Sequence, residues 1–200
     1  MTAPHAHLVD DDDAIRDALA WLLRSRNQPS TAYDSAESFL EAWHPALSGC
    51  VVLDMRMSGM SGLDCFEQLQ LRGSTLPVIF LTGHGDVPLA VATLKKGAFD
   101  FFEKPFNDND LAIRIEEAIA LDSQQRSALA AADSLRARLD SLTTRERQIM
   151  SLVLAGKFNK VIADELNISM RTVEVHRANL FEKMQVKTAV ELANLLKQGH

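Results

Sequence analysis

The 200-residue sequence lacks several features that would assign it to a specialised class of proteins. It has no apolar run approaching the roughly 20 residues that span a bilayer, so neither a membrane segment nor a membrane partner is expected. Its N-terminus has no basic stretch followed by an apolar one, which argues against a secretion signal. The only cysteines are Cys50 and Cys65, too few for a disulfide framework, although a redox pair stays open as an alternative. We therefore expect a cytoplasmic globular protein, because thiols stay reduced in that compartment.

Positive charge is scarce in the first part of the chain. Residues 1–122 carry 19 acidic and 9 basic side chains, whereas residues 143–200 carry 6 acidic and 9 basic ones. An acidic front and a mildly basic back predict two domains with different partners. The basic surplus permits binding to nucleic acid without proving it.

Short apolar runs alternate with amphipathic stretches in residues 1–122. The runs at 7–10, 29–33, 50–54, 77–82 and 99–103 are bounded by Pro, Gly or Asp, which predicts five strands. Apolar residues at helical spacing predict five helices between and after the strands. Their markers are Ile15, Leu19, Leu22 and Leu23; Phe39, Leu40 and Trp43; Phe66, Leu69 and Leu71; Leu89, Val91 and Leu94; and Leu111, Ile115 and Ile119. This order predicts an α/β fold with a doubly wound, five-stranded parallel sheet.

Residues 121–142 contain neither proline nor glycine. Apolar residues recur there every seven positions, at Leu121, Ala128, Leu135 and Leu142. We predict a helical linker over 123–142. Its stripe either leans on a domain or pairs with a second copy of the chain, and three short heptads leave both interpretations open.

Residues 143–200 show only helical patterns. Thr143 or Thr144 is predicted to cap a helix through residue 154, with Glu146 as the partner in a capping box, and Gly156 ends it. The residues predicted to cap the three following helices are Asn159, Ser169 and Thr188. Two helices joined by a tight turn at 167–169, the second longer and basic, predict an all-α helix-turn-helix domain.

Polar residues follow four of the predicted strands. Asp10 and Asp11 end the first, Asp54 the third and Thr82 the fourth, and Lys104 follows the fifth. These side chains are expected to converge, because the carboxyl ends of parallel strands meet at one edge of a sheet. Clustered carboxylates repel one another, and a hard cation such as Mg²⁺ held by oxygen ligands relieves that repulsion. The cation would clamp a phosphoryl group against Asp54, while Lys104 and the Thr82 hydroxyl would each contact a phosphate oxygen.

Each of these residues alone has an ordinary structural explanation. An Asp that ends a strand often caps the next helix, and Asp12 or Asp13 is expected to do so here. The presence of all five residues at the matching strand ends favours a phosphorylation site.

The segments VDDDD, LDMRMSGMSGLD, FLTGHGD and FEKPF resemble the receiver domain of response regulators, over residues 1–122. The resemblance implies that Asp54 accepts phosphate from a sensor histidine kinase. It also implies Mg²⁺ bound by the carboxylates of Asp11 and Asp54, with Asp10 nearby through water. The backbone carbonyl of Arg56 would supply another ligand.

The same resemblance places Thr82 and Phe101 at the family's switch positions, where the hydroxyl moves toward the phosphate and the ring follows inward. Residues 86–110 match the family's usual dimer surface, which implies a homodimer promoted by phosphorylation. One residue departs from the pattern, because Ser58 stands where the family usually has proline. Proline would fix φ and stiffen the loop, so Ser58 puts loop rigidity and phosphate lifetime in doubt.

Residues 143–197 resemble the DNA-binding domain of LuxR-type regulators through LTTRERQIMSLVLAGKFNKVIADELNIS and MRTVEVHRANLFEKM. The second segment would be the recognition helix in the major groove, with Val173, Leu180 and Met184 pointing inward. Asn or Glu can read base edges there, and Arg or Lys can reach phosphates or guanine. The candidate DNA contacts, whose four Lys and Arg are the phosphate candidates, are Lys160, Arg171, Thr172, Glu174, Val175, His176, Arg177, Asn179 and Lys183. For each basic residue the alternative is a solvated surface charge.

Within this class, TGHGDVPLAV, FEKPF and TVEVHRAN are similar to the FixJ subgroup. The resemblances together imply a two-component response regulator with a receiver domain (1–122), a helical linker (123–142) and a LuxR-type helix-turn-helix domain (143–200). Its expected partners are the kinase and promoter DNA, with RNA polymerase as a further candidate. It is not expected to be a conventional enzyme, because phosphotransfer to Asp54 would be autocatalytic.

Two other functions are weighed against this one. A DNA-binding protein that uses its receiver only as a dimerisation scaffold should have a degraded acidic pocket, whereas all five pocket residues are present here. A phosphotransfer relay protein would not need residues 143–197.

Overall fold

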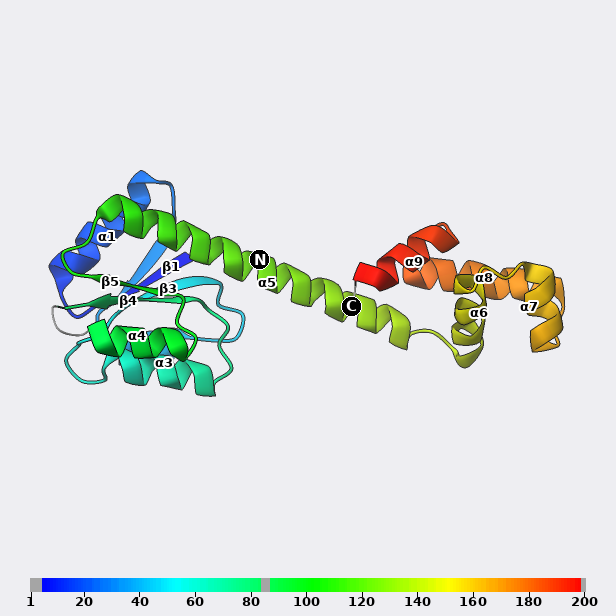
Figure 1. The fold of residues 1–200 in the computed structure, drawn as a ribbon, viewed down its shortest axis with the longest axis horizontal. Helices are drawn as coiled ribbons and strands as arrows, with labels where there is room; N and C mark the ends of the chain where they lie inside the picture. The colour runs from blue at the N-terminus through cyan, green and yellow to red at the C-terminus, as the bar shows by residue number, and fades with distance from the viewer. Residues whose placement is uncertain (1–4, 84–86, 199–200) are drawn as a thin grey trace. The chain divides into compact units, whose positions relative to one another are not determined.

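Five parallel strands form the centre of the first of two units in a computed structural model that describes residues 5–83 and 87–198. The first unit ends at Arg126 and the second begins at Ser127, and each is described by itself. The strands are β1 (His5–Val9), β2 (Ser30–Tyr33), β3 (Gly49–Asp54), β4 (Val78–Thr82) and β5 (Asp100–Glu103). Their spatial order is β2-β1-β3-β4-β5 (Figure 1). The predicted doubly wound parallel sheet is confirmed, although β1 begins at His5 rather than at residue 7.

Helices cover both faces of this sheet. On one face, α1 (Asp13–Ser25) and α5 (Asp108–Asp140) pack through buried leucine and isoleucine side chains against β1, β3 and β4. On the other face lie α2 (Ala36–Ala42), α3 (Gly62–Leu71) and α4 (Val87–Lys95). All six residues of β3 are buried, because the strand is covered on both faces. Asp54 is the last residue of that strand, so a strand buried along its whole length positions it.

Three of the predicted helix markers are exposed. Leu71 is 80% exposed, because it lies two residues beyond the buried Leu69 and so on the opposite side of a helix with 3.6 residues per turn. Leu89 and Val91 of α4 are also exposed, whereas Leu94 packs against the core. The helical spacing of apolar residues predicted these helices correctly. It wrongly placed the side chains of Leu71, Leu89 and Val91 on the buried face.

Side chains cap most of the helix starts at the predicted residues. The Asp12 carboxylate accepts from the Ala14 N–H, and Thr143 and Glu146 form the predicted capping box. Ser169 also caps its helix, through the Thr172 N–H. The prediction that Asn159 caps the next helix is wrong, because Phe158 occupies that position without a side-chain bond. Asn159 instead accepts a hydrogen bond from Arg177 at 2.8 Å.

The long helix α5 contains most of the predicted linker. Its first part packs on the sheet through Leu111, Ile115 and Ile119. Nearer its end, Leu135 and Leu139 pack against the core of the second unit, as does Leu142 beyond it. These contacts favour the interpretation in which the apolar stripe packs against a domain of the same chain. The domain boundaries at 122 and 142 stay a prediction.

The second unit is helical. It contains α6 (Thr144–Leu154), α7 (Asn159–Leu166), α8 (Met170–Met184) and α9 (Ala189–Gln198). Its core includes Ile149, Ile162 and the three residues of α8 predicted to point inward, Val173, Leu180 and Met184, all of them fully buried. The tight turn between α7 and α8 is made by Asn167 in the left-handed conformation. The predicted helix-turn-helix arrangement is thus present.

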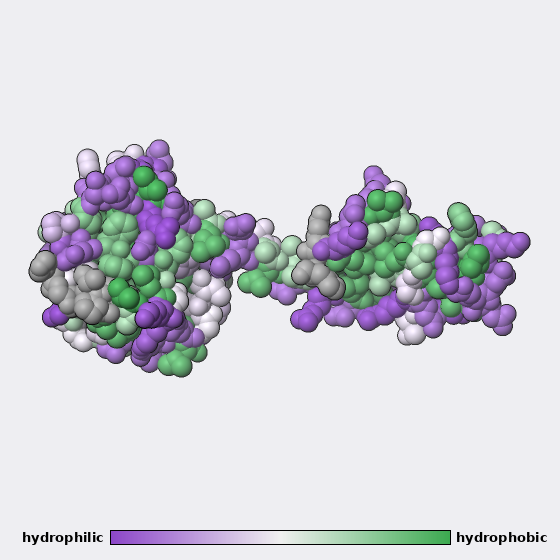
Figure 2. Space-filling model, viewed as in Figure 1, coloured by the Kyte–Doolittle hydropathy of each residue, from purple (hydrophilic) through white to green (hydrophobic). Residues whose placement is uncertain are grey.

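Both units show apolar areas among hydrophilic side chains on the face drawn in Figure 2. Among the helices that the structure describes, none has the length and apolar character needed to cross a membrane.

Candidate functional site

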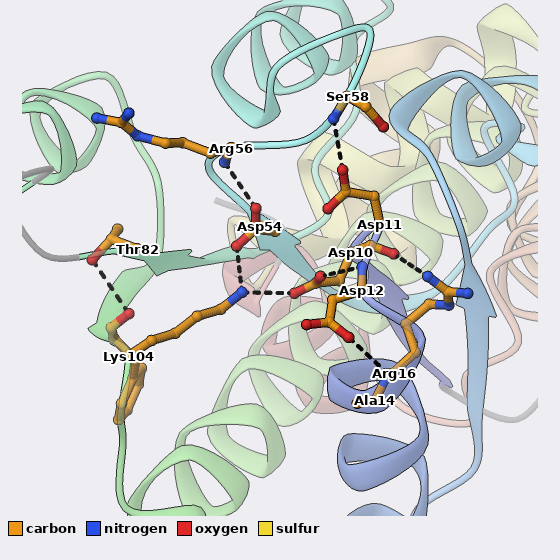
Figure 3. A network of polar contacts seen from close by, with 11 residues as sticks. Asp10, Asp11, Asp12, Ala14, Arg16, Asp54, Arg56, Ser58, Thr82 and Lys104 are labelled. Atoms are coloured by element: carbon orange, nitrogen blue, oxygen red, sulfur yellow. Dashed lines mark hydrogen bonds and ion pairs between the residues drawn. The ribbon is translucent and has the colours of Figure 1, made fainter.

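The predicted acidic pocket lies at the carboxyl edge of the sheet. Asp10 follows β1, Asp54 ends β3 and Thr82 ends β4, while Lys104 follows β5. Because the four strands are parallel and adjacent, their ends bring these residues to one edge (Figure 3). Asp11 extends the site from the turn before α1.

Lys104 is the cationic centre of the pocket. Its Nζ donates to Asp54 Oδ1 at 2.6 Å and to Asp10 Oδ2 at 2.9 Å. Both carboxylates are buried, and the Lys104 side chain is about a quarter exposed. The ammonium therefore bridges two carboxylates from strands that are neighbours in the sheet. Its positive charge is stabilised both by two hydrogen bonds of good length and by the attraction of the two carboxylates.

The buried location shifts the ionisation of these groups. Burial raises the pKa of Asp54, and the negative charge of Asp10 acts in the same direction, while hydrogen bonds from Lys104 and the Arg56 N–H oppose the rise. Burial lowers the pKa of Lys104, but its bonds to the two carboxylates outweigh burial and raise the pKa overall. Lys104 is thus held in its charged form beside the proposed acceptor.

The chemistry of the donor set fits a hard divalent cation. One carboxylate oxygen from each of Asp10, Asp11 and Asp54 can be chosen so that all three lie within 4.8 Å of one another. Oxygen ligands in a small, strongly negative cluster are what Mg²⁺ prefers, and Mg²⁺ completes its shell with water. The Arg56 N–H donates to Asp54 Oδ2 at 2.9 Å, which places the Arg56 backbone directly beside the cluster.

Asp11 is held by a contact that sequence reasoning missed. Its Oδ2 accepts a hydrogen bond from the backbone N–H of Ser58 at 2.7 Å. This bond joins the turn after β1 to the loop after β3, and it is the main cause that lowers the pKa of Asp11. The sequence showed that residue 58 is serine instead of proline and therefore has a backbone N–H. It did not show that this N–H donates to Asp11.

The two predicted switch residues lie on the last two strands, Thr82 at the end of β4 and Phe101 within β5. Thr82 is fully buried, and its hydroxyl donates to the Phe102 carbonyl at 3.4 Å rather than to a carboxylate (Figure 3). Phe101 is partly buried and packs against the core under α2, α3 and α4. In this structure, therefore, the Thr82 hydroxyl bonds to a backbone carbonyl and the Phe101 ring packs in the core.

A further buried carboxylate, outside the acidic pocket, lies in the receiver unit and was also missed by sequence reasoning. Asp122 on α5 is fully buried and accepts from the Gly49 N–H at 2.8 Å and from Arg126 Nε at 2.9 Å. Arg126 also donates to the Leu47 carbonyl. The signal was present, since Asp122 continues the helical spacing of the buried Ile119 side of α5. The contacts fasten α5 to the loop before β3.

The predicted DNA-contact residues are divided by their environments. On α8, Arg171, Glu174, Val175 and Asn179 are exposed, and Thr172 and His176 are partly exposed. Lys160 on α7 is exposed as well. These seven side chains are accessible to a ligand.

Two of the four phosphate candidates make bonds within the domain. Lys183 Nζ donates to the buried Glu146 at 2.7 Å. Arg177 bonds to Asn159 and lies over the ring of Phe181 at 5.4 Å. Their contacts to DNA stay predictions, and for Lys183 the ion pair with Glu146 supports a structural role as the alternative.

Comparisons with known proteins agree with both units. Residues 6–116 match the response regulator receiver domain family, and residues 140–196 match the bacterial regulatory proteins of the luxR family. The transcriptional regulatory protein FixJ of Bradyrhizobium diazoefficiens is 46% identical over 195 residues, covering 97% of this chain and 95% of that protein. The C4-dicarboxylate transport transcriptional regulatory protein DctR of Rhodobacter capsulatus is 46% identical over 191 residues, covering 94% and 97%.

Solved structures show the same similarity. The structure of the response regulator StyR superposes with a TM-score of 0.90 at 41% identity and covers 98% of each chain. Full-length FixJ from B. japonicum gives a TM-score of 0.61 at 44% identity, covering 100% of this chain and 98% of that one.

Proposed function

This chain belongs to the two-component response regulators that join a receiver domain to a LuxR-type DNA-binding domain, and we propose that phosphorylation of Asp54 controls its binding to promoter DNA. The observation that carries the proposal is the bridge made by Lys104 between Asp10 and Asp54 at the carboxyl edge of the sheet. It supplies a buried carboxylate nucleophile with a fixed cation beside it.

The phosphoryl donor would be a phosphohistidine of a sensor histidine kinase. An Asp54 oxygen attacks phosphorus, the P–N bond of the donor breaks, and an acyl phosphate forms on Asp54. Lys104, whose ammonium bonds to Asp54 Oδ1 at 2.6 Å, would then donate to a phosphate oxygen. Mg²⁺ bound by Asp11, Asp54 and the Arg56 carbonyl, with Asp10 nearby through water, would neutralise charge on the transferring group.

The surface beside the pocket suits a protein donor. A groove of about 480 Å³ opens next to Lys104, and Ile15, Leu19 and Leu22 of α1 line it together with Phe106. An apolar groove that Lys104 lines could hold a helix of the kinase while its histidine reaches Asp54.

Phosphate on Asp54 would add about −1.5 to −2 charge and three acceptor oxygens. The Thr82 hydroxyl, which now donates to a carbonyl at 3.4 Å, would gain a stronger acceptor in the phosphate. Phe101, which is only partly buried, would follow inward. We propose that this change promotes a homodimer through the surface at 86–110, of which residue 86 lies outside the described residues.

On the DNA side, α8 would enter the major groove. Glu174 and Asn179 would face base edges, and Lys160 and Arg171 would contact phosphates. We further propose the boundaries 1–122, 123–142 and 143–200 for receiver, linker and DNA-binding domain. The protein would act in the cytoplasm, where promoter DNA and RNA polymerase are available as partners, and its only chemistry would be its own phosphorylation.

Labelling by a small-molecule acyl phosphate with Mg²⁺ tests the proposal. The parent protein should become phosphorylated, Asp54→Asn should not, and the surface variant Asp133→Asn should behave as the parent does. Promoter DNA selected from genomic fragments should then bind more tightly to the phosphorylated parent than to Asp54→Asn. Equal labelling of Asp54→Asn would refute the acceptor assignment, whereas DNA binding indifferent to labelling would favour a scaffold role for the receiver.

A further inference from the structure

Two loops of the receiver unit are joined by the bond from the Ser58 N–H to Asp11. The donor lies in the loop after β3, and the acceptor lies in the turn between β1 and α1. The distance of 2.7 Å is that of a strong hydrogen bond to a charged acceptor. In Figure 3 the Asp11 oxygen that does not receive this bond lies on the side of Asp54.

We propose that the Ser58 N–H is a positioning group for the cation site, holding one Asp11 oxygen so that the other faces the ion. This inference rests on the proposed function, because it assumes that Asp10, Asp11 and Asp54 hold Mg²⁺. It goes beyond that site in two respects. The bond between the Ser58 N–H and Asp11 persists when the cation is bound, and the cation binds more tightly because of this bond.

Asp11 needs such support more than the other two carboxylates do. Asp10 and Asp54 are 2% and 6% exposed, and Lys104 and neighbouring backbone N–H groups bond to their oxygens. Asp11 is exposed, and its side chain would otherwise rotate in water. Fixing one oxygen removes part of the conformational entropy that the cation would have to overcome. Groups that orient a metal ligand in this way commonly change metal affinity by about 10- to 100-fold.

The loop that carries Ser58 is held by a second, independent bond. The Met60 N–H donates to Glu37 Oε1 of α2 at 2.9 Å. Removing this bond would loosen the same loop while leaving the Ser58 N–H available to Asp11. Glu37→Ala is therefore a matched control that separates loop stiffness from the direct effect of the N–H.

The experiment is a titration of the full-length protein with MgCl₂. Binding is measured by calorimetry and by the shifts of amide resonances in nuclear magnetic resonance spectra. Ser58→Pro deletes the N–H, and Ser58→Ala keeps it while removing the hydroxyl. We expect Ser58→Pro to weaken Mg²⁺ binding on the order of 10-fold. Glu37→Ala should stay close to the parent, and Ser58→Ala should lose less than Ser58→Pro, because it keeps the N–H and removes only the weaker contact of the hydroxyl with Asp11. Equal or tighter binding by Ser58→Pro overturns the inference, as does an equal loss in Glu37→Ala.

The Ser58 amide provides a test that does not depend on the folding of the proline variant. Its proton resonance should move upfield in Asp11→Ala, because the hydrogen bond is lost. In the parent it should stay downfield at saturating Mg²⁺, and an upfield shift there would mean that the ion displaces the N–H, contrary to the inference.

The failure of the metal site itself has a different signature. If Mg²⁺ binds the parent and Asp11→Ala equally, the proposed cation site is wrong, and this inference falls with it. If Asp11→Ala weakens binding but Ser58→Pro does not, the site stands and only the role of Ser58 is refuted.

Discussion

Replacing Lys183 by methionine should destabilise the DNA-binding unit without changing how salt affects DNA binding. The ammonium of Lys183 donates to Glu146 Oε2 at 2.7 Å and to the Ser141 carbonyl at 3.2 Å. Glu146 is only 3% exposed, and in the variant it would keep the Thr143 N–H at 2.8 Å as a donor. Methionine retains much of the apolar stem, so the substitution removes mainly the charge.

The magnitude follows from this geometry. A hydrogen bond to a charged group contributes about 1.5–3 kcal/mol. The Lys183 side chain is about one-third exposed, so water screens part of the interaction. We therefore expect a loss of about 1–2 kcal/mol in the free energy of unfolding. For a domain of this size, that loss lowers the melting temperature by roughly 4–16 °C.

The effect should depend on pH. Burial opposes ionisation of Glu146, but its hydrogen bonds with Lys183 and Thr143 outweigh burial and lower its pKa below the usual 4.5. A carboxylate with a lowered folded-state pKa stabilises the fold above its unfolded pKa. The difference between parent and variant should therefore be complete above pH 4.5 and disappear as the pH falls through the folded-state pKa.

The two tryptophans allow the units to be followed separately. Trp21 and Trp43 both lie in the receiver unit, so their fluorescence reports its unfolding, whereas far-ultraviolet circular dichroism also reports α6 to α9. Lys183→Met should shift the dichroism transition and leave the fluorescence transition in place. The exposed Arg171→Met should instead reduce the slope of log affinity against log salt by about 1. The reasoning is refuted if Lys183→Met melts like the parent and reduces the salt slope.

Three further changes test the receiver unit. Asp122→Ala should lower the free energy of unfolding of this unit by about 2–4 kcal/mol, because the Gly49 N–H loses a buried acceptor. Denaturation followed by tryptophan fluorescence measures this loss, and Asp133→Ala, at an exposed residue, should be neutral. Gly62→Ala should cost about 1–3 kcal/mol and slow acyl phosphate labelling, because its Cβ would lie 2.1 Å from the Asp54 carbonyl oxygen; an unchanged rate would contradict the tight packing. Asp54→Asn should raise the melting temperature at pH 7 without Mg²⁺, since burial raises the Asp54 pKa and makes its ionised form unfavourable; this gain should vanish near pH 3, where the carboxyl is protonated in both states.

Much of the fold could be predicted from local pattern. The alternation of apolar runs with helical periodicity led to the parallel sheet, because each period reflects which face of an element is buried. Caps such as Asp12, Thr143 and Ser169 were predictable, because a cap and its N–H lie within about three residues of each other. Asn159 failed as a cap because Arg177, 18 positions away, is its partner.

The sequence by itself determined which chemical groups stand at the strand ends. Asp10, Asp54, Thr82 and Lys104 occupy ends that a parallel sheet brings together. Only the tertiary structure decided how these groups are held: which oxygen of Asp11 the Ser58 N–H takes, and that Thr82 bonds to a carbonyl. The reason is physical, since periodicity records the burial of a face, whereas a hydrogen bond between residues far apart in the chain depends on the packing of whole elements to within a fraction of an ångström.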